Sequence, residues 1–308
     1  MPKIFLAPTT FGHYSYQPIK FLEEYNFEHS ANSIARKLLP KEIIELAHSA
    51  EGIIAGTETY SEEVIERLPN LKVISRLGVG MDNIDLKAAE EKGIKVFKTK
   101  TTPAPAVAEL VLGLMINVSR HISQSDQLIK NGSWKKEMGC LLQGKTLGII
   151  GLGIIGKALI RLVQGFDFTV LAYDRVKDEK FQKEYSVKYS ELDTLLKESD
   201  IVSLHVNLTD QTVHLINKTR LELMKPDSVL INTSRGEIID ENALFQALED
   251  NQLAGAGLDV FNKEPYDGSL SKLNNVVLTP HIGSYAREIR IQMEIEAAQN
   301  LIKGLSYE

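Results

Sequence analysis

The chain has 308 residues, of which 43% are hydrophobic and 25% are charged, and its formal net charge is -6. This length suits two domains, each of them able to bury a core. The acidic balance argues against a general nucleic-acid-binding protein, which would be expected to be basic. Its single cysteine, Cys140, excludes an internal disulfide and indicates a reducing compartment, where we expect a small core or loop residue rather than a nucleophile.

The N-terminus contains no long apolar stretch before a cleavage site, so we expect no signal peptide. The apolar run 107–118 is too short to cross a bilayer, and it contains Glu109 and Asn117. These features predict a cytoplasmic protein with no membrane contact.

The first hundred residues alternate short apolar runs with amphipathic segments, which indicates βα units and a parallel sheet. The expected strands are residues 3–6, 52–55, 73–75 and 94–97. The expected helices are residues 40–49, 61–68 and 86–92. A Thr- and Pro-rich segment, 99–105, then breaks the pattern, and helices at 106–121 and 123–131 follow.

A second alternating run begins at Thr146. Its six expected strands are residues 146–150, 168–172, 201–204, 229–231, 255–258 and 276–278. Its expected helices are residues 156–164, 190–197, 215–224 and 241–250. A last helix, 286–304, has no place in a completed six-strand domain, so we expect it to return to the first domain. The α/β fold would then consist of two doubly wound parallel-sheet domains, with residues 102–283 inserted into a discontinuous domain of residues 1–101 and 284–308.

The motif Gly151-Leu-Gly153-Ile-Ile-Gly156 lies directly after the strand 146–150 and opens a helix. In a dinucleotide-binding turn, the first glycine permits the tight turn, the second admits the pyrophosphate, and the third allows close helix–strand packing. The helix N-terminus then faces the phosphates. The alternative is a plain βα turn without a ligand.

Asp174 ends the second strand of this run, where an acid binds the ribose hydroxyls of a dinucleotide. A carboxylate there repels the extra phosphate of NADP and favours NAD, although the charge of Arg175 would offset part of this preference. Asp174 could also be an ordinary acid at a strand end.

Arg235, Glu264 and His281 each follow a different predicted strand of this domain. Ligands of open parallel sheets bind outside the carboxyl ends of the strands. A guanidinium there would grip a substrate carboxylate, and an imidazole beside a carboxylate would act as general acid or base. Each residue alone could be a turn or surface residue, but their shared position predicts hydride transfer to or from a small 2-hydroxy or 2-keto acid.

The chain resembles the D-isomer-specific 2-hydroxyacid dehydrogenases along nearly its whole length. This resemblance rests on the glycine motif, Asp174, His205-Val-Asn-Leu-Thr209, Asn232-Thr-Ser-Arg-Gly236, Gly257-Leu-Asp-Val-Phe261 with Glu264, and Thr279-Pro-His-Ile-Gly283. It implies a Rossmann NAD-binding domain inserted into a flavodoxin-like substrate domain, and a homodimer. The helix 106–121 is a plausible subunit contact, or it simply packs within the chain.

The resemblance also implies roles for individual residues. Arg235 would bind substrate, His281 would be the acid/base, Glu264 would be its partner, and Asp259 would contact the nicotinamide carboxamide. Further residues expected at the cofactor are Gly151, Gly153, Ile154, Ile155, Gly156, Asp174, Val206, Asn207, Thr233, Ser234 and Ser284. Asn207 stands where the family usually has proline, so local rigidity beside the cofactor would be lower, with no expected loss of function. No metal site is expected.

The segment 75–83 indicates the substrate. By the same resemblance, Val79 and Gly80 would meet the substrate carboxylate, and Arg76 would aim at a phosphate or else pair with a nearby acid. This pattern looks like the phosphoglycerate dehydrogenase branch, in a short form without a regulatory domain.

Against this branch, Gly56-Thr57-Glu58 stands where it often has arginine, and the only basic residues near Trp134 are Lys135 and Lys136. A 3-phosphoglycerate dehydrogenase is therefore the first preference, with glyoxylate or hydroxypyruvate reduction as the alternative. A non-catalytic NAD-sensing protein is a weaker alternative. A methyltransferase would leave the three residues past the strands without a role.

Overall fold

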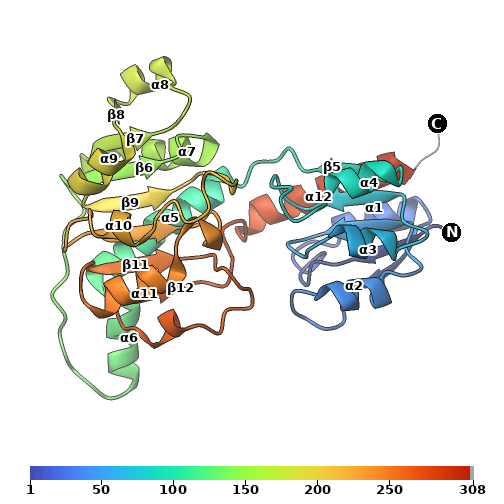
Figure 1. Ribbon diagram of the computed structural model, residues 1–308. Helices are drawn as coiled ribbons and strands as arrows, with labels where there is room; N and C mark the ends of the chain where they lie inside the picture. Colours follow the sequence, from blue (N-terminus) through green and yellow to red (C-terminus); the bar gives the residue numbers. More distant parts are fainter. Residues whose placement is uncertain (306–308) are drawn as a thin grey trace. The chain divides into compact units, whose positions relative to one another are not determined.

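The computed structural model describes residues 1–305, which form two compact units (Figure 1). The first unit contains residues 1–103 together with residues 284–305, and the second contains residues 104–283. The sequence analysis placed the first crossing between residues 101 and 102.

The first unit is built on a five-stranded parallel sheet in the order β2-β1-β3-β4-β5. Its strands are β1 (Lys3–Leu6), β2 (Glu28–Ala31), β3 (Gly52–Ala55), β4 (Val73–Arg76) and β5 (Lys95–Lys98). This order is that of flavodoxin-like domains, as predicted.

Helices cover both faces of this sheet, each over an apolar core. They are α1 (Gln17–Glu24), α2 (Pro40–Leu46), α3 (Glu62–Glu66), α4 (Leu86–Glu91) and α12 (Arg287–Leu305). One core joins α2, α3 and α4 to the sheet, and the other joins α1 and α12. The last helix is tied to the sheet where the Ser75 hydroxyl donates a hydrogen bond of 2.8 Å to the Ala297 carbonyl.

The second unit is built on a seven-stranded parallel sheet in the order β12-β11-β10-β9-β6-β7-β8. Its strands are β6 (Thr146–Ile150), β7 (Thr169–Tyr173), β8 (Lys188–Tyr189), β9 (Ile201–Leu204), β10 (Val229–Asn232), β11 (Gly255–Leu258) and β12 (Val276–Leu278). From β8 to β11, the order is that of a Rossmann fold, extended by β12. The order reverses between β6 and β9, and ligands of such sheets bind at this point.

Two cores flank this sheet as well, one with α5 and α7 and the other with α9, α10 and α11. The helices are α5 (Ala104–Arg120), α6 (Ile122–Lys130), α7 (Ile154–Leu162), α8 (Glu179–Glu184), α9 (Leu192–Glu198), α10 (Lys218–Leu221) and α11 (Glu241–Glu249). Within residues 1–305, no single helix has the length and apolarity to cross a membrane. Only α5 and α6 together pass that test, across a bend of 61°.

Two strands, β2 and β8, and two α-helices, α1 and α8, were not predicted. The strand β2 pairs only with β1, and none of its side chains is buried, so it lacks the apolar run of a central strand. The helix α10 is much shorter than the predicted 215–224. Ile216 instead forms a bridge to Ile239, and the Asn217 side chain caps the helix by accepting a hydrogen bond from the Arg220 N–H.

Candidate active site

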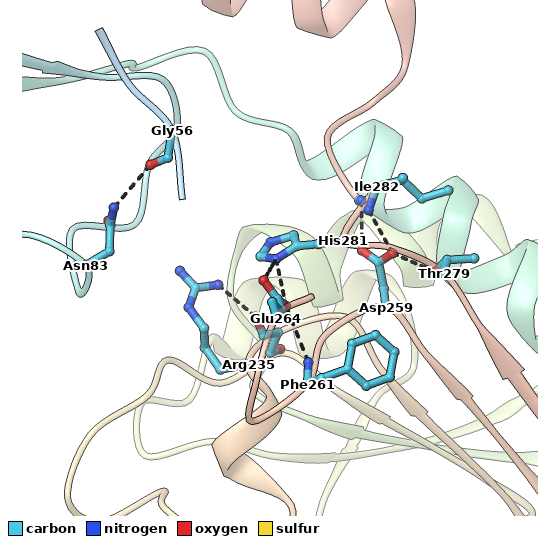
Figure 2. A network of polar contacts seen from close by, with 11 residues as sticks. Gly56, Asn83, Arg235, Asp259, Phe261, Glu264, Thr279, His281 and Ile282 are labelled. Carbon is cyan, nitrogen blue, oxygen red and sulfur yellow. Dashed lines mark hydrogen bonds and ion pairs between the residues drawn. The ribbon is translucent and has the colours of Figure 1, made fainter. Parts of the chain in front are cut away.

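Arg235, Glu264 and His281 lie in the segments that follow β10, β11 and β12, which are neighbours in the sheet (Figure 2). Because these strands are parallel, their carboxyl ends share one edge. The chain also brings the first two segments into close contact, since a Cβ on Gly236 would overlap the backbone of Phe261 and Asn262. The structure thus gathers all three predicted residues at one edge of the second unit.

The imidazole of His281 faces the carboxylate of Glu264. Its Nδ1 atom lies 3.0 Å from Oε1 and 3.0 Å from Oε2. Oε1 also accepts a longer hydrogen bond, of 3.4 Å, from the Phe261 N–H. Glu264 orients the ring through Nδ1. Because the His281 side chain is 32% exposed, Nε2 can exchange a proton with a ligand.

Asp259 holds the turn that carries His281. Its side chain accepts hydrogen bonds from the Thr279 hydroxyl (2.5 Å), the Ile282 N–H (2.8 Å) and the Gly283 N–H (2.8 Å). His281 has a φ of +56°, which a side-chain-bearing residue adopts only where its surroundings impose it. Burial raises the pKa of the Asp259 carboxyl, and the three hydrogen bonds oppose that rise. Asp259 is therefore a positioning residue for His281, and its predicted contact with the nicotinamide stays a prediction.

Arg235 lies in a turn organised by Asn232, the last residue of β10. The Asn232 amide donates to the Arg235 carbonyl (2.8 Å) and accepts from the Ser234 N–H (3.0 Å). The Arg235 Nη1 donates to the Ser234 carbonyl at 2.7 Å. These hydrogen bonds fix the backbone of the turn and the position from which the Arg235 side chain extends.

The glycine motif has the geometry that a pyrophosphate requires. Gly151 has a φ of +98°, and a Cβ there would lie 2.7 Å from the His205 carbonyl carbon. A Cβ on Gly156 would lie 2.6 Å from the Gly151 carbonyl oxygen. Gly153, by contrast, precedes α7 in open space, where a Cβ would meet no protein atom within 4 Å. The N-terminus of α7 is thus reachable by a phosphate group, and these residues fit a dinucleotide.

Asp174 follows β7 and lies against the glycine turn. Its Oδ2 accepts a hydrogen bond of 2.7 Å from the Leu152 N–H, and its Oδ1 accepts one of 3.0 Å from the Val176 N–H. A carboxylate oxygen can accept more than one hydrogen bond, so Asp174 could still bind ribose hydroxyls. Arg175 donates instead to the Gln211 side chain at 3.3 Å.

The other residues expected at the cofactor follow three strands of the same edge, except Ser284. Ile154 and Ile155 form the first turn of α7, Val206 and Asn207 follow β9, and Thr233 and Ser234 follow β10. The Ser234 hydroxyl donates to the Leu204 carbonyl at 2.7 Å and ties the last two segments together. Ser284 belongs to the first unit.

His205 has chemistry that the sequence analysis did not assign. Its Nε2 lies 2.9 Å from the Ser203 hydroxyl, while Nδ1 is buried without a hydrogen-bond partner in the described part of the chain. The Thr233 hydroxyl is also buried and has no hydrogen-bond partner among the described residues. Thr233 directly follows Asn232, which pairs with Leu204 in the sheet. Burial lowers the pKa of His205 to about 4. His205 belongs to the motif His205-Val-Asn-Leu-Thr209 named in the sequence analysis, but nothing in the residue pattern indicated that its ring is buried.

The substrate residues expected from the segment after β4 lie in the first unit. Arg76 ends β4 and is buried, Val79 is exposed, and Gly80 is half-buried. Among residues 1–305, no group of three or more His, Cys, Asp and Glu side chains could hold a metal ion. Cys140 is exposed in the segment after α6.

Residues 112–283 match the family model described as D-isomer specific 2-hydroxyacid dehydrogenase, NAD binding domain. The chain belongs to the D-isomer specific 2-hydroxyacid dehydrogenases. This dehydrogenase is accordingly an oxidoreductase that acts on small 2-hydroxy or 2-keto acids, and its cofactor is NAD. The predicted family, enzyme class and cofactor are confirmed.

Similar proteins cover most of this dehydrogenase. A glyoxylate reductase of Thermococcus litoralis is 44% identical over 80% of this chain and 77% of its own. A hydroxypyruvate reductase of Thermotoga maritima is 40% identical over 92% of this chain and 91% of its own. A D-3-phosphoglycerate dehydrogenase of Archaeoglobus fulgidus is 40% identical over 86% of this chain, which spans only 52% of that protein. The crystal structure of the TT0316 protein of Thermus thermophilus has a TM-score of 0.87 and 36% identity, over 98% of this chain and 96% of its own.

Proposed function

We propose that this dehydrogenase reduces glyoxylate or hydroxypyruvate with NADH. Two relatives named above support this choice over 3-phosphoglycerate, which was the first preference from the sequence. The glyoxylate reductase and the hydroxypyruvate reductase match this chain over most of their own length, whereas the chain spans only 52% of the D-3-phosphoglycerate dehydrogenase. The alternative from the sequence therefore replaces the first preference.

The observation that carries the chemistry is the His281–Glu264 pair at the edge where Arg235 also lies. Arg235 binds the carboxylate of the oxo acid with its guanidinium fork and polarises the adjacent carbonyl. His281 donates a proton from Nε2 to the carbonyl oxygen, and Glu264 stabilises the charged ring and fixes its orientation. NADH, when bound, supplies the hydride that carbon 2 receives. In the opposite direction, His281 takes the hydroxyl proton.

The cofactor lies, in this proposal, against the turn of Gly151, Gly153 and Gly156, with its ribose at Asp174. Its other contacts come from Ile154, Ile155, Val206, Asn207, Thr233, Ser234, Asp259 and Ser284. The N–H groups of Val79 and Gly80 receive the substrate carboxylate from the first unit. We propose that the substrate domain is residues 1–101 and 284–308, of which 306–308 lie outside the described residues, and that the NAD-binding domain is residues 102–283.

Loss of NADH absorbance tests the substrate directly. Purified protein is given glyoxylate, hydroxypyruvate, pyruvate and phosphohydroxypyruvate at saturating NADH, and kcat/KM is compared. The proposal expects the highest values for glyoxylate and hydroxypyruvate. Turnover of none of the four acids would reject it.

We also infer that the protein is a cytoplasmic homodimer. The apolar side chains of α5 are largely buried inside its own unit, where the helix packs on α7, β10 and β11. Large apolar side chains are instead exposed on α6 and the segment after it, among them Trp134 (82% exposed) and Met138 (91%). Several large apolar side chains exposed in one stretch of chain favour a protein contact. Light scattering at micromolar concentration should give twice the chain mass, and Trp134→Glu should shift the protein toward monomer.

A further inference from the structure

The guanidinium of Arg76 lies under the backbone segment that follows β4. Arg76 is 7% exposed, its Nη1 donates to the Leu77 carbonyl, and its Nε donates to the Asn83 Oδ1 at 3.4 Å. Gly78 has a φ of +147°, and a Cβ there would collide with the guanidinium. The positively charged group therefore packs directly against the Gly78 backbone.

Asn83 and Glu58 complete a buried network around this cation. The Asn83 amide donates to the carbonyls of Gly56 (3.1 Å) and Glu58 (2.6 Å), and Figure 2 shows the first of these contacts. The Glu58 carboxylate is buried and accepts from the Gly56 N–H at 2.8 Å. Burial raises the pKa of the Tyr60 hydroxyl, Glu58 raises it further and Arg76 lowers it, so both charges lie within electrostatic reach of one buried ring. The network joins the ends of β3 and β4.

The segment held by this network keeps donors for a ligand. The Gly78 carbonyl accepts a hydrogen bond of 3.3 Å from the Thr99 N–H. In the part of the chain that the structure describes, the N–H groups of Val79 and Gly80 make no hydrogen bond. Consecutive backbone N–H groups bind anions, and a buried cation beneath them strengthens the positive potential there.

We propose that Arg76 is a positioning residue that holds the Gly78–Gly80 segment for a substrate carboxylate and does not bind a substrate phosphate. The site then selects 2-oxo acids whose third carbon is absent or carries an uncharged group. This inference rests on the proposed function and gives Arg76 a structural role in it.

The basic side chains considered for a phosphate site also support this role for Arg76. A guanidinium that recognises phosphate presents its donors to the ligand, whereas Arg76 directs two of them at Leu77 and Asn83. Of the two other basic candidates, Lys135 and Lys136, Lys135 forms an ion pair of 2.6 Å with Glu137.

The test compares hydroxypyruvate with phosphohydroxypyruvate, which differ only in the phosphate. In the unaltered protein, we expect kcat/KM for hydroxypyruvate to exceed that for phosphohydroxypyruvate by about 10-fold or more. Arg76→Ala should lower kcat/KM for both acids by a similar factor, about 10-fold, mainly through KM, with the NADH Kd unchanged. Asn83→Ala, which loosens the same segment and leaves the arginine in place, should act in the same direction on both acids.

Two results would overturn the proposal. One is a preference of the unaltered protein for phosphohydroxypyruvate, a measurement that does not depend on whether a variant folds. The other is a loss in Arg76→Ala confined to phosphohydroxypyruvate, with turnover of hydroxypyruvate retained. Either result leaves the dehydrogenase activity itself standing, whereas failure to turn over any 2-oxo acid would reject the proposed function instead.

Discussion

The Nδ1 atom of His281 lies 3.0 Å from each carboxylate oxygen of Glu264. A carboxylate centred on one ring nitrogen leaves the other nitrogen for the substrate and stabilises the ring when it carries a proton. The consequences of this pairing, and of the contacts around it, can be checked by substitution.

Glu264→Gln should lower kcat for 2-oxo acid reduction on the order of 10- to 100-fold, because a neutral amide no longer stabilises a protonated ring. NADH affinity should stay unchanged. Glu241→Gln is the matched control, since Glu241 accepts from the Asn262 N–H at 3.2 Å in the same region and does not contact His281. Steady-state kinetics and NADH fluorescence measure both quantities, and equal kcat in the two variants would remove Glu264 from the mechanism.

Asp259→Asn should destabilise the protein by about 1–3 kcal/mol, because an amide cannot accept all three hydrogen bonds that the carboxylate accepts. It should also lower kcat, since the turn of His281 loses its restraint. The control is Asp240→Asn at the N-cap of α11, where asparagine caps as well as aspartate and the change should stay within about 0.5 kcal/mol. Urea unfolding of the two variants gives the comparison, and equal losses would contradict the role given to Asp259.

Gly153→Ala should weaken NADH binding and change the free energy of unfolding by no more than about 1 kcal/mol. A methyl group there meets no protein atom within 4 Å, so within the folded protein it can oppose only a ligand that approaches the turn. Gly165→Ala, at another glycine with open space around it, should leave NADH binding unchanged. Unaltered NADH affinity in Gly153→Ala would place the pyrophosphate elsewhere.

The burial of His205 should make stability depend on pH. Its pKa is about 4 in the folded protein, below the ordinary value near 6.5, so the unfolded chain binds the proton more readily. The stability contribution is present above pH 6.5 and is lost as pH falls toward 4, by no more than about 3 kcal/mol. His205→Gln should flatten this loss, and the exposed His48→Gln should not. Unfolding free energies measured between pH 4 and 7 would show the difference, and identical curves for all three proteins would contradict it.

Much of the fold could be predicted because its central strands are buried on both faces. Runs such as Gly52–Ala55 and Ile201–Leu204 are buried at every position and are mostly apolar. The edge strands β2 (Glu28-His-Ser-Ala31) and β8 (Lys188–Tyr189) contain no run of apolar residues, whereas β5 and β12, which are also edge strands, do contain one and were predicted. Edge strands form because a neighbour offers hydrogen bonds, which depends on tertiary structure rather than on local pattern.

The sequence indicated candidate site residues but not the contacts that hold them in place. Arg235, Glu264 and His281 each follow a predicted strand, and their side chains suit carboxylate binding and acid/base chemistry. The hydrogen bonds that Asp259 accepts from the Ile282 and Gly283 N–H groups depend on how two loops pack against each other. The spacing of these residues in the sequence does not reveal that packing. For Arg76, the sequence left open a phosphate contact or an internal pairing, and the packing of its side chain under Gly78 favours an internal role.

The most direct test of this account is the rate of NADH oxidation by His281→Ala with glyoxylate and hydroxypyruvate. If His281 supplies the proton, kcat falls by about 10²–10⁴-fold while NADH binds as tightly as before. A variant that keeps the unaltered kcat would contradict the account, because the group held by Glu264 would then have no part in the reaction.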